Sequence, residues 1–285
     1  MSRLIINADD FGLTSGVNRA IVELHRFGVL TSATLMARAG ATGEAIDLAL
    51  ATLSLGVGCH VVLVDGEPVL PAREIPTLVD ATTGRFRTSL TAFLARLMTG
   101  RICSGEIEAE AAAQIGLLQS KGIRLGHIDT HKHTHMFPGV LRPVLRAARA
   151  AGISAVRNPF EPVWAVRATA GASWARAAEV KVLRNLQGAC RRIVAEEGFT
   201  TTDGTIAVVG TGILNGTTLR SLLGQLPTGT WELVTHPGYN DADLDKVRTR
   251  LRASRETERE ALHAIKEFPE LELISYFTLL SSALP

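Results

Sequence analysis

Short apolar segments alternate with longer amphipathic ones along most of this 285-residue chain. The continuous apolar character of buried parallel strands is present at residues 3–8, 32–37, 55–63, 123–130, 153–157, 205–209 and 231–235, and in part at 271–279. Apolar residues at helical spacing predict helices at residues 15–27, 42–53, 89–99, 104–121, 138–151, 175–197, 216–225 and 241–267. This alternation gives about seven βα units, which is typical of a parallel sheet covered by helices.

The expected fold is an irregular (β/α) barrel with about seven parallel strands, because the length of the chain suits a closed or nearly closed barrel. A doubly wound open sheet is the alternative. No linker is long or polar enough to separate two domains, so we predict a single domain over residues 1–285. Residues 158–204 interrupt the pattern, and we interpret them as an irregular insertion that faces a substrate or a membrane.

The composition narrows the class of protein. Hydrophobic residues make up 46% of the chain, and its scattered charges sum to only +2, which argues against a nucleic-acid-binding protein. Three separated cysteines without a CxxC pair fit a reducing cytoplasm better than a disulfide framework. There is no signal-peptide pattern, and no apolar stretch reaches the roughly 20 residues that span a bilayer. We therefore expect a cytoplasmic protein, with peripheral contact at the inner face of the membrane and a homodimer left open.

Polar clusters follow four of the predicted strands. They are Asp9-Asp10, His60, the run from His127 to His135, and the run from Thr235 to Gly238. In parallel α/β folds the functional residues lie at the C-terminal ends of the strands, which meet at one end of the barrel. Each cluster alone is weak evidence, but together they predict one active site.

The histidine run is the strongest of these signals. Four of the eight histidines lie between residues 127 and 135. They occupy every second position of this run, except that position 129 is Asp129. In an extended chain all of these side chains would share one face. Imidazoles at this density suit a divalent metal ion, with carboxylates to orient the rings.

The remaining clusters could complete a metal site. His60 lies among apolar residues, so its ring needs a partner: either a metal ion or a hydrogen bond within the core. The adjacent carboxylates of Asp9 and Asp10 repel each other and favour a nearby cation, although a turn or a helix cap would also explain them. One Asp and two His form a normal ligand set for Zn²⁺ and an acceptable one for Mn²⁺, Co²⁺ or Mg²⁺.

Two further residues could take part in the chemistry. His236 precedes a Pro-Gly turn and could protonate a leaving amine as a general acid, or could be an ordinary loop histidine. Arg157 ends its predicted strand, where it could hold a substrate oxygen, pair with Asp9, or form an ordinary salt bridge.

At these residues the chain resembles the YdjC/ChbG-like carbohydrate deacetylases. The resemblance rests on Asn7–Gly12, Gly58-Cys59-His60, His127–Pro138 and His236-Pro237, which occur in the family's order. It implies an irregular (β/α) barrel that removes an N-acetyl group from an amino sugar. It also implies that one divalent ion, with zinc favoured over magnesium, manganese or cobalt, is held by Asp10, His60 and His131.

The same resemblance implies that Asp9 is the base and His236 the acid. Lys132 departs from the histidine more usual at that position. We predict substrate contacts for a further set of residues near the strand ends, namely Arg157, His127, Asp129, His133, Phe160 and Trp164.

The substrate class follows only in part. The segment Arg157–Pro162 resembles the branch of the family associated with hopanoid biosynthesis, which implies an N-acetylglucosaminyl hopanoid lipid as substrate. The alternatives are a deacetylase of soluble chito-oligosaccharides, a metal-dependent phosphoester hydrolase or amidohydrolase, and a non-catalytic glycolipid-binding protein with a structural metal. A structural site would be closed by four protein ligands, whereas a catalytic one leaves positions open.

Overall fold

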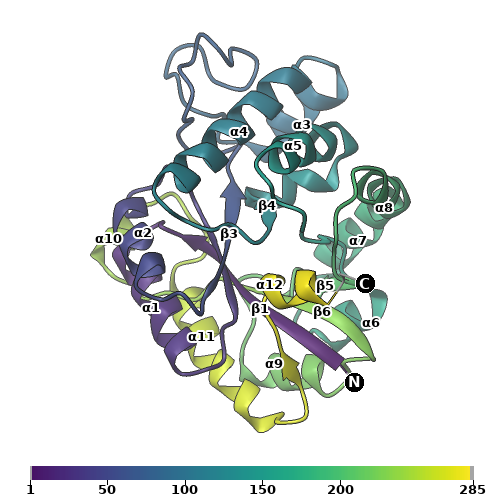
Figure 1. Ribbon diagram of the computed structural model, residues 1–285. Coiled ribbons are helices and arrows are strands. Elements are labelled where there is room, and N and C mark those ends of the chain that lie inside the picture. Colours follow the sequence, from purple (N-terminus) through teal and green to yellow (C-terminus); the bar gives the residue numbers. More distant parts are fainter. Residues whose placement is uncertain (1, 283–285) are drawn as a thin grey trace.

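A parallel sheet forms the centre of the computed structural model, which describes residues 2–282 (Figure 1). The strands run in the order β4-β3-β2-β1-β6-β5, and β7 pairs with the start of β1. Their bounds are β1 Ser2–Phe11, β2 Ser32–Leu35, β3 Gly56–Val61, β4 Ile128–Thr130, β5 Gly204–Ile206, β6 Gly229–Thr235 and β7 Glu272–Leu273. All pairings are parallel.

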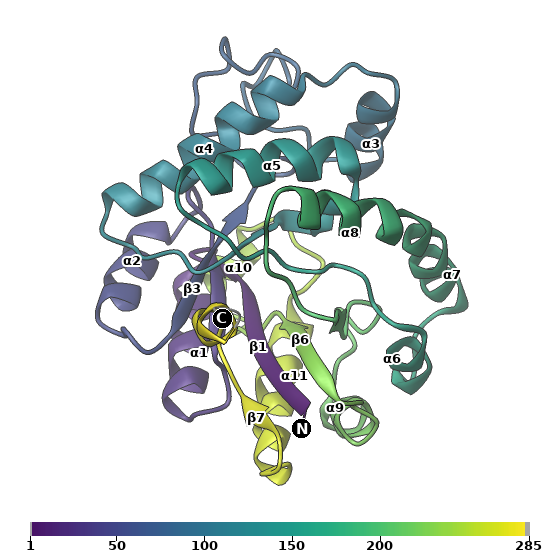
Figure 2. The same cartoon turned by 45° about the vertical axis from the view of Figure 1, so that its right-hand side comes forward.

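Helices surround this sheet (Figures 1 and 2). Those of the first half are α1 Ser15–Arg26, α2 Thr42–Leu50, α3 Leu90–Met98, α4 Ser104–Ser120 and α5 Pro138–Ala150. Those of the second half are α6 Val163–Ala168, α7 Trp174–Leu183, α8 Gln187–Glu196, α9 Gly216–Leu223, α10 Ala242–Asp245, α11 Ala253–Ala261 and α12 Tyr276–Ser281. Three 3-10 helices complete the set: η1 His131–Met136, η2 Arg184–Leu186 and η3 Leu262–Glu267. No helix within residues 2–282 is both long and apolar enough to cross a bilayer.

The sheet curls into a half-barrel, so the predicted irregular (β/α) barrel with parallel strands is confirmed. Between the ends of the sheet, residues 153–157 are held only by isolated bridges, from Val156 to Ile128 and from Ala155 to Thr200. The amide of Ile128 donates to the carbonyl of Ala155 at 3.0 Å, which fixes this segment beside β4. The strand predicted at residues 153–157 is therefore present only as two isolated bridges.

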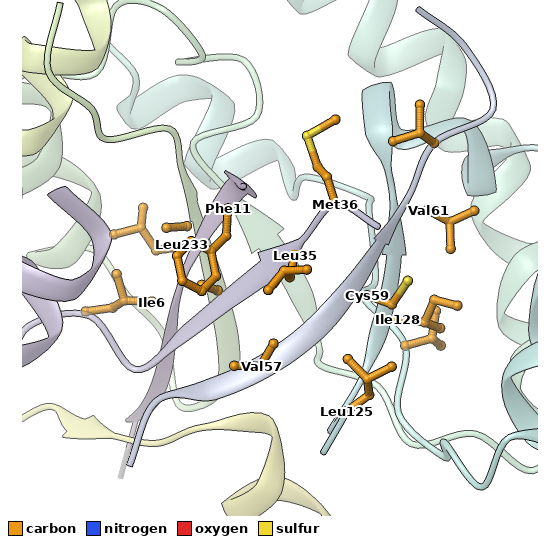
Figure 3. Packing of buried hydrophobic residues seen from close by; sticks show 14 of the residues in the cluster. Ile6, Phe11, Leu35, Met36, Val57, Cys59, Val61, Leu125, Ile128 and Leu233 are labelled. Carbon is orange, nitrogen blue, oxygen red and sulfur yellow. The ribbon is translucent and has the colours of Figure 1, made fainter. Parts of the chain in front are cut away.

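The two faces of the sheet differ in chemistry because side chains alternate along each strand. On β1, Leu4, Ile6 and Ala8 belong to the large core beneath the surrounding helices, whereas Ile5 belongs to a small cluster with Tyr276 of α12. Figure 3 shows the outer packing around residues that include Ile6, Phe11, Leu35, Val57, Cys59, Ile128 and Leu233. The inner face carries polar side chains toward the C-terminal ends of the strands, as the next section describes.

Three predicted elements near the C-terminus and in the insertion have different bounds. Helix 241–267 is broken into α10, α11 and η3, and the Arg252 guanidinium donates to the carbonyl of Asp245 in the break. Strand 271–279 is limited to β7, because the Ser275 hydroxyl accepts from the amide of Thr278 and caps the start of α12. The helix predicted at 175–197 is two helices joined by η2.

Gly58 on β3 is required by the packing inside the barrel. A Cβ at this position would lie 2.4 Å from Cε1 of His127. Gly58→Ala should therefore lower the free energy of unfolding by about 1–3 kcal/mol, since neither the strand nor the buried ring can move freely.

Urea unfolding of the variant measures this effect, and Gly116→Ala on the exposed side of α4 is the matched control. A Cβ at Gly116 meets nothing within 4 Å, so this helix substitution should raise stability by about 0.5–1 kcal/mol. Equal stability of Gly58→Ala and the wild type would contradict the close packing.

Candidate active site

A β-bulge in β1 brings the side chains of both adjacent aspartates, Asp9 and Asp10, into the same region of the site. The pairing of β1 with β2 shifts register between Ala8 and Phe11, and Asp10 has a φ of +65°. In a regular strand the side chains of Asp9 and Asp10 would point to opposite faces, but a bulge re-aims one of them. As a result both carboxylates reach the surroundings of His60 on β3.

Three side chains form a cluster that could hold a metal ion. Asp10 Oδ1 lies 3.7 Å from His60 Nε2 and 3.5 Å from His131 Nδ1, and the two ring nitrogens are 3.3 Å apart. Ligands at zinc bond lengths in a tetrahedral site lie roughly 3.4 Å apart. The separations and the chemistry of the three donors therefore fit one divalent ion.

The groups behind this cluster orient its ligand atoms. Asp129 Oδ1 lies 2.8 Å from His60 Nδ1, which leaves Nε2 of the same ring directed at the cluster. The Arg255 guanidinium donates to Oδ2 of Asp10 at 2.5 Å, which leaves Oδ1 available. A carboxylate behind a histidine ligand is a usual support for a protein-bound metal.

The extended geometry that would put the whole histidine run on one face stops at Thr130, which is the predicted end of strand 123–130. Strand β4 ends there, and residues 131–136 turn into η1, with Lys132 and His133 at φ values of +56° and +50°. The Thr130 hydroxyl accepts from the amide of His135 at 3.0 Å, so the chain folds back on its strand end. His131 consequently faces the cluster, and Lys132 instead pairs with Asp65 at 2.7 Å.

Arg157 is the centre of a buried ionic network. Its guanidinium donates to both oxygens of Asp9, at 2.6 and 2.9 Å, to Glu232 at 2.8 Å, and contacts Asp129. The structure thus shows the pairing with Asp9, which is one of the roles considered for Arg157. The side chain is buried, and its contact with a substrate remains a prediction. Burial raises the pKa of Asp9, but the charge and hydrogen bonds of Arg157, together with His60 and His236, outweigh this effect, so the net pKa lies well below its usual range.

His236 lies between the carboxylates of Asp9 and Glu258. Its Nε2 is 3.8 Å from Asp9 Oδ2, and its Nδ1 is 3.7 Å from Glu258 Oε2. Glu258 also accepts from the backbone amide of His236 at 2.7 Å. Burial lowers the pKa of His236, but Glu258 and the two aspartates outweigh it, so the net pKa is raised and the protonated ring is favoured.

Comparisons with known proteins identify the family of this chain. The sequence profile described as "YdjC-like protein" matches residues 3–268, which is most of the chain. The chain belongs to the YdjC-like family. A carbohydrate deacetylase of Thermoanaerobacter pseudethanolicus is 28% identical over 92% of this chain and 91% of its own length. A human carbohydrate deacetylase is 31% identical over 83% and 75%, respectively.

Other relatives match over a shorter span or in structure. A carbohydrate deacetylase of Brevibacillus brevis is 44% identical, but the match covers 55% of this chain and only 60% of that protein. Among solved structures, a protein of Enterococcus faecalis described as a candidate cellobiose-phosphate cleavage protein superimposes with a TM-score of 0.75. The two sequences are 26% identical, and the superposition covers 98% of each chain. These matches support the YdjC-like fold along the whole described chain.

This YdjC-like protein also has site residues that the sequence did not indicate. Arg255 and Glu258 are buried on α11, where a spacing of three residues puts both on the face toward β1. The sequence predicted a helix over residues 241–267 but did not mark these two residues within it. Only the tertiary structure distinguishes these two residues from the exposed charges around them, because nothing in their local sequence marks them.

Several residues predicted to contact substrate lie elsewhere. His127 is fully buried and stacks on Tyr276 with ring centroids 3.7 Å apart, and burial lowers its pKa. Phe160 is buried in the core, and Trp164 packs edge-on against Trp231. These three side chains thus make contacts within the barrel, and their contact with a substrate remains a prediction.

The other two predicted contact residues are close to the cluster. Asp129 is fully buried and orients His60, as described above. His133 is partly buried in η1, and burial lowers its pKa to about 3. His133 therefore remains a predicted contact residue, in the neutral form.

A second group of potential ligands overlaps the first. Asp9, His60 and Asp129 also have donor atoms within 4.8 Å of one another. Both carboxylates of this group are occupied by Arg157, and all three side chains are buried. The group with Asp10 is favoured because His131 is 21% exposed, which gives water and substrate access to one side.

Asp129→Asn tests the supporting role of the buried carboxylate. The amide cannot carry the charge that orients His60, so Zn²⁺ affinity should fall by about 10–100-fold. Isothermal titration of the metal-free protein measures this change, with the exposed Asp47→Asn as the control. Unchanged affinity in Asp129→Asn would mean that His60 binds no metal or needs no support.

Proposed function

We propose that this protein is a metal-dependent carbohydrate N-deacetylase that hydrolyses the acetamide group of an amino sugar. The observation that carries the proposal is the meeting of three ligand-type side chains, Asp10, His60 and His131, with the Asp9–His236 pair at one end of the barrel. A base and an acid next to an accessible divalent-ion site are the groups that amide hydrolysis requires.

The names of the relatives support this activity. Proteins similar over most of this chain are called carbohydrate deacetylases, and a relative from Salmonella, 38% identical over 53% of this chain, is called a chitooligosaccharide deacetylase. The accessible, three-ligand arrangement favours a catalytic ion over the closed structural ion of a glycolipid-binding protein. A phosphoester hydrolase would more often bridge two ions with further carboxylates.

A bound divalent ion would supply Lewis acidity, which lowers the pKa of water and polarises a carbonyl oxygen. Asp10, His60 and His131 would hold this ion. We favour zinc because of the two imidazoles, with magnesium, manganese or cobalt as alternatives.

Asp9 and His236 would move the protons. Asp9 accepts a proton from the attacking water, and its pairing with Arg157 keeps it ionised and fixed for that task. His236, whose raised pKa favours the protonated ring, donates a proton to the departing nitrogen as the C–N bond breaks. The products are acetate and the free amine, and water supplies the remaining atoms.

The proposed substrates are N-acetylated chito-oligosaccharides and, more specifically, an N-acetylglucosaminyl hopanoid. The second rests on the resemblance of Arg157–Pro162 to the hopanoid-associated branch of the family. An acetate-release assay on N-acetylglucosamine, N,N′-diacetylchitobiose and the glycolipid, after chelation and return of single metals, tests both the activity and the ion. No acetate from any of these substrates with any of the four metals would refute the proposal.

Asp9→Asn should reduce turnover by about 10²–10⁴-fold, because the amide cannot accept the proton from water. Metal content should stay at the wild-type level, since Asp10, His60 and His131 remain. Acetate release and elemental analysis of the same preparation measure the two effects, with Asp47→Asn as the control. Wild-type turnover in Asp9→Asn would remove it from the role of base.

Glu258→Gln should move the alkaline limb of the pH–rate profile to lower pH. The negative charge of Glu258 raises the pKa of His236, so its loss lowers that pKa and deprotonates the acid earlier as pH rises. The profile of kcat/KM against pH measures the shift. An unmoved alkaline limb, with metal content intact, would show that His236 is not the acid that limits the rate.

A further inference from the structure

Positive charge is concentrated in one segment of the chain. Residues 163–192, which form α6, α7, η2 and most of α8, contain one acidic residue, Glu179, and six basic ones, namely Arg167, Arg176, Lys181, Arg184, Arg191 and Arg192. The net charge of the segment is thus +5, in a chain whose total is +2. The rest of the protein is net negative, so this segment differs from it in charge. Figure 2 shows α6, α7 and α8 along one side of the molecule.

The positive charges of this segment are not neutralised within the protein. Among residues 2–282, none of the six basic side chains has a carboxylate oxygen within 4.0 Å, whereas Arg142 and Arg149 on the neighbouring α5 both pair with Glu197. Five of the six are exposed, and Arg184 is partly exposed. The segment therefore presents free cations to whatever lies outside it.

Large apolar side chains are exposed on the same flank. Trp174 is 85% exposed and Val182 is 66% exposed, although both lie on the ordered helix α7. Together with Lys181 they follow a spacing of seven and eight residues, which puts all three on one side of the helix. The buried side of α7 is formed by Val180 instead.

We propose that this basic apolar face, formed by Trp174, Lys181 and Val182 on the exposed side of α7 within the net-positive segment 163–192, binds the surface of an anionic lipid bilayer. An exposed indole on a helix surrounded by cations is the arrangement that enters the interface between headgroups and acyl chains. Each basic residue near anionic headgroups adds to the attraction. A neutral protein partner would leave these charges without counterions.

A chain of hydrogen bonds links helix α7 to the candidate active site. Arg176 donates to the carbonyl of Val208 at 3.2 Å, which ties α7 to residues 207–214. In that loop the amide of Gly212 donates to Glu258 at 3.2 Å, and Glu258 holds His236. These contacts connect the proposed membrane-binding helix to His236, which would suit deacetylation of a lipid-linked amino sugar. This last step rests on the proposed function, whereas the membrane contact itself does not.

Sedimentation of the full chain with vesicles tests the contact. One set of vesicles contains phosphatidylcholine alone, and the other contains equal parts of phosphatidylcholine and anionic phosphatidylglycerol. We expect binding to the second set that weakens as salt is raised, and at least about tenfold weaker binding to the first.

Two variants and two matched controls assign the binding to this face. Trp174→Ser and Lys181→Glu should each weaken binding to the anionic vesicles by about fivefold or more. Met98→Ser removes another exposed apolar side chain, 77% exposed on α3, and Lys121→Glu reverses another exposed charge. Both controls should bind like the wild type, and thermal unfolding checks that all four variants are folded.

Three outcomes would overturn the proposal. They are equal binding to both vesicle sets, equal loss in variants and controls, and tighter salt-sensitive binding to single-stranded RNA than to vesicles. Deacetylation of N,N′-diacetylchitobiose by the same preparations separates this proposal from the proposed function. Vesicle binding without acetate release would refute only the function, and acetate release without vesicle binding would refute only the surface.

Discussion

The buried guanidinium of Arg157 is the interaction on which the rest of the site depends. It reaches carboxylates from three different strands, Asp9 on β1, Asp129 on β4 and Glu232 on β6, and thereby ties the two halves of the curled sheet together. Burying such charges is costly unless each is paired, so loss of the arginine would leave three uncompensated carboxylates. The same network keeps Asp9 ionised and aimed at the site.

The balance of charge inside the barrel also favours the proposed binding of a cation. Around the site, five buried carboxylates face only two buried arginines; these residues are Asp9, Asp10, Asp129, Glu232, Glu258, Arg157 and Arg255. The burial of unpaired negative charge is unfavourable, and a divalent ion offsets most of the excess. In its absence the surrounding acids raise the pKa of His60 to about 9, even though burial alone lowers it. The site is thus arranged to attract positive charge near Asp10.

The separation of polar and apolar side chains across the sheet makes this site compatible with a stable fold. The outer face of β1 joins the large core, while Tyr276 and Ile5 fill the closed end of the barrel beneath the ionic network. The Tyr276 hydroxyl donates to Glu232 at 2.5 Å, so a residue of this small cluster also satisfies a buried carboxylate of the ionic network. Stability comes from burial of the outer face, and the inner face is left free for chemistry.

The sequence by itself determined the βα alternation, the parallel curled sheet and the clusters at the strand ends, because hydrophobic period and strand polarity are local properties. It also marked Asp9, Asp10, His60, His131 and His236 as a group, through their positions after strands. Only the tertiary structure decided how these side chains point. The bulge at Asp10 and the turn after Thr130 replace the regular geometry that alternation assumes. Arg255 contacts Asp10, which lies 245 residues away in the sequence, and Glu258 contacts His236, which lies 22 residues away. No local sequence pattern indicates such contacts.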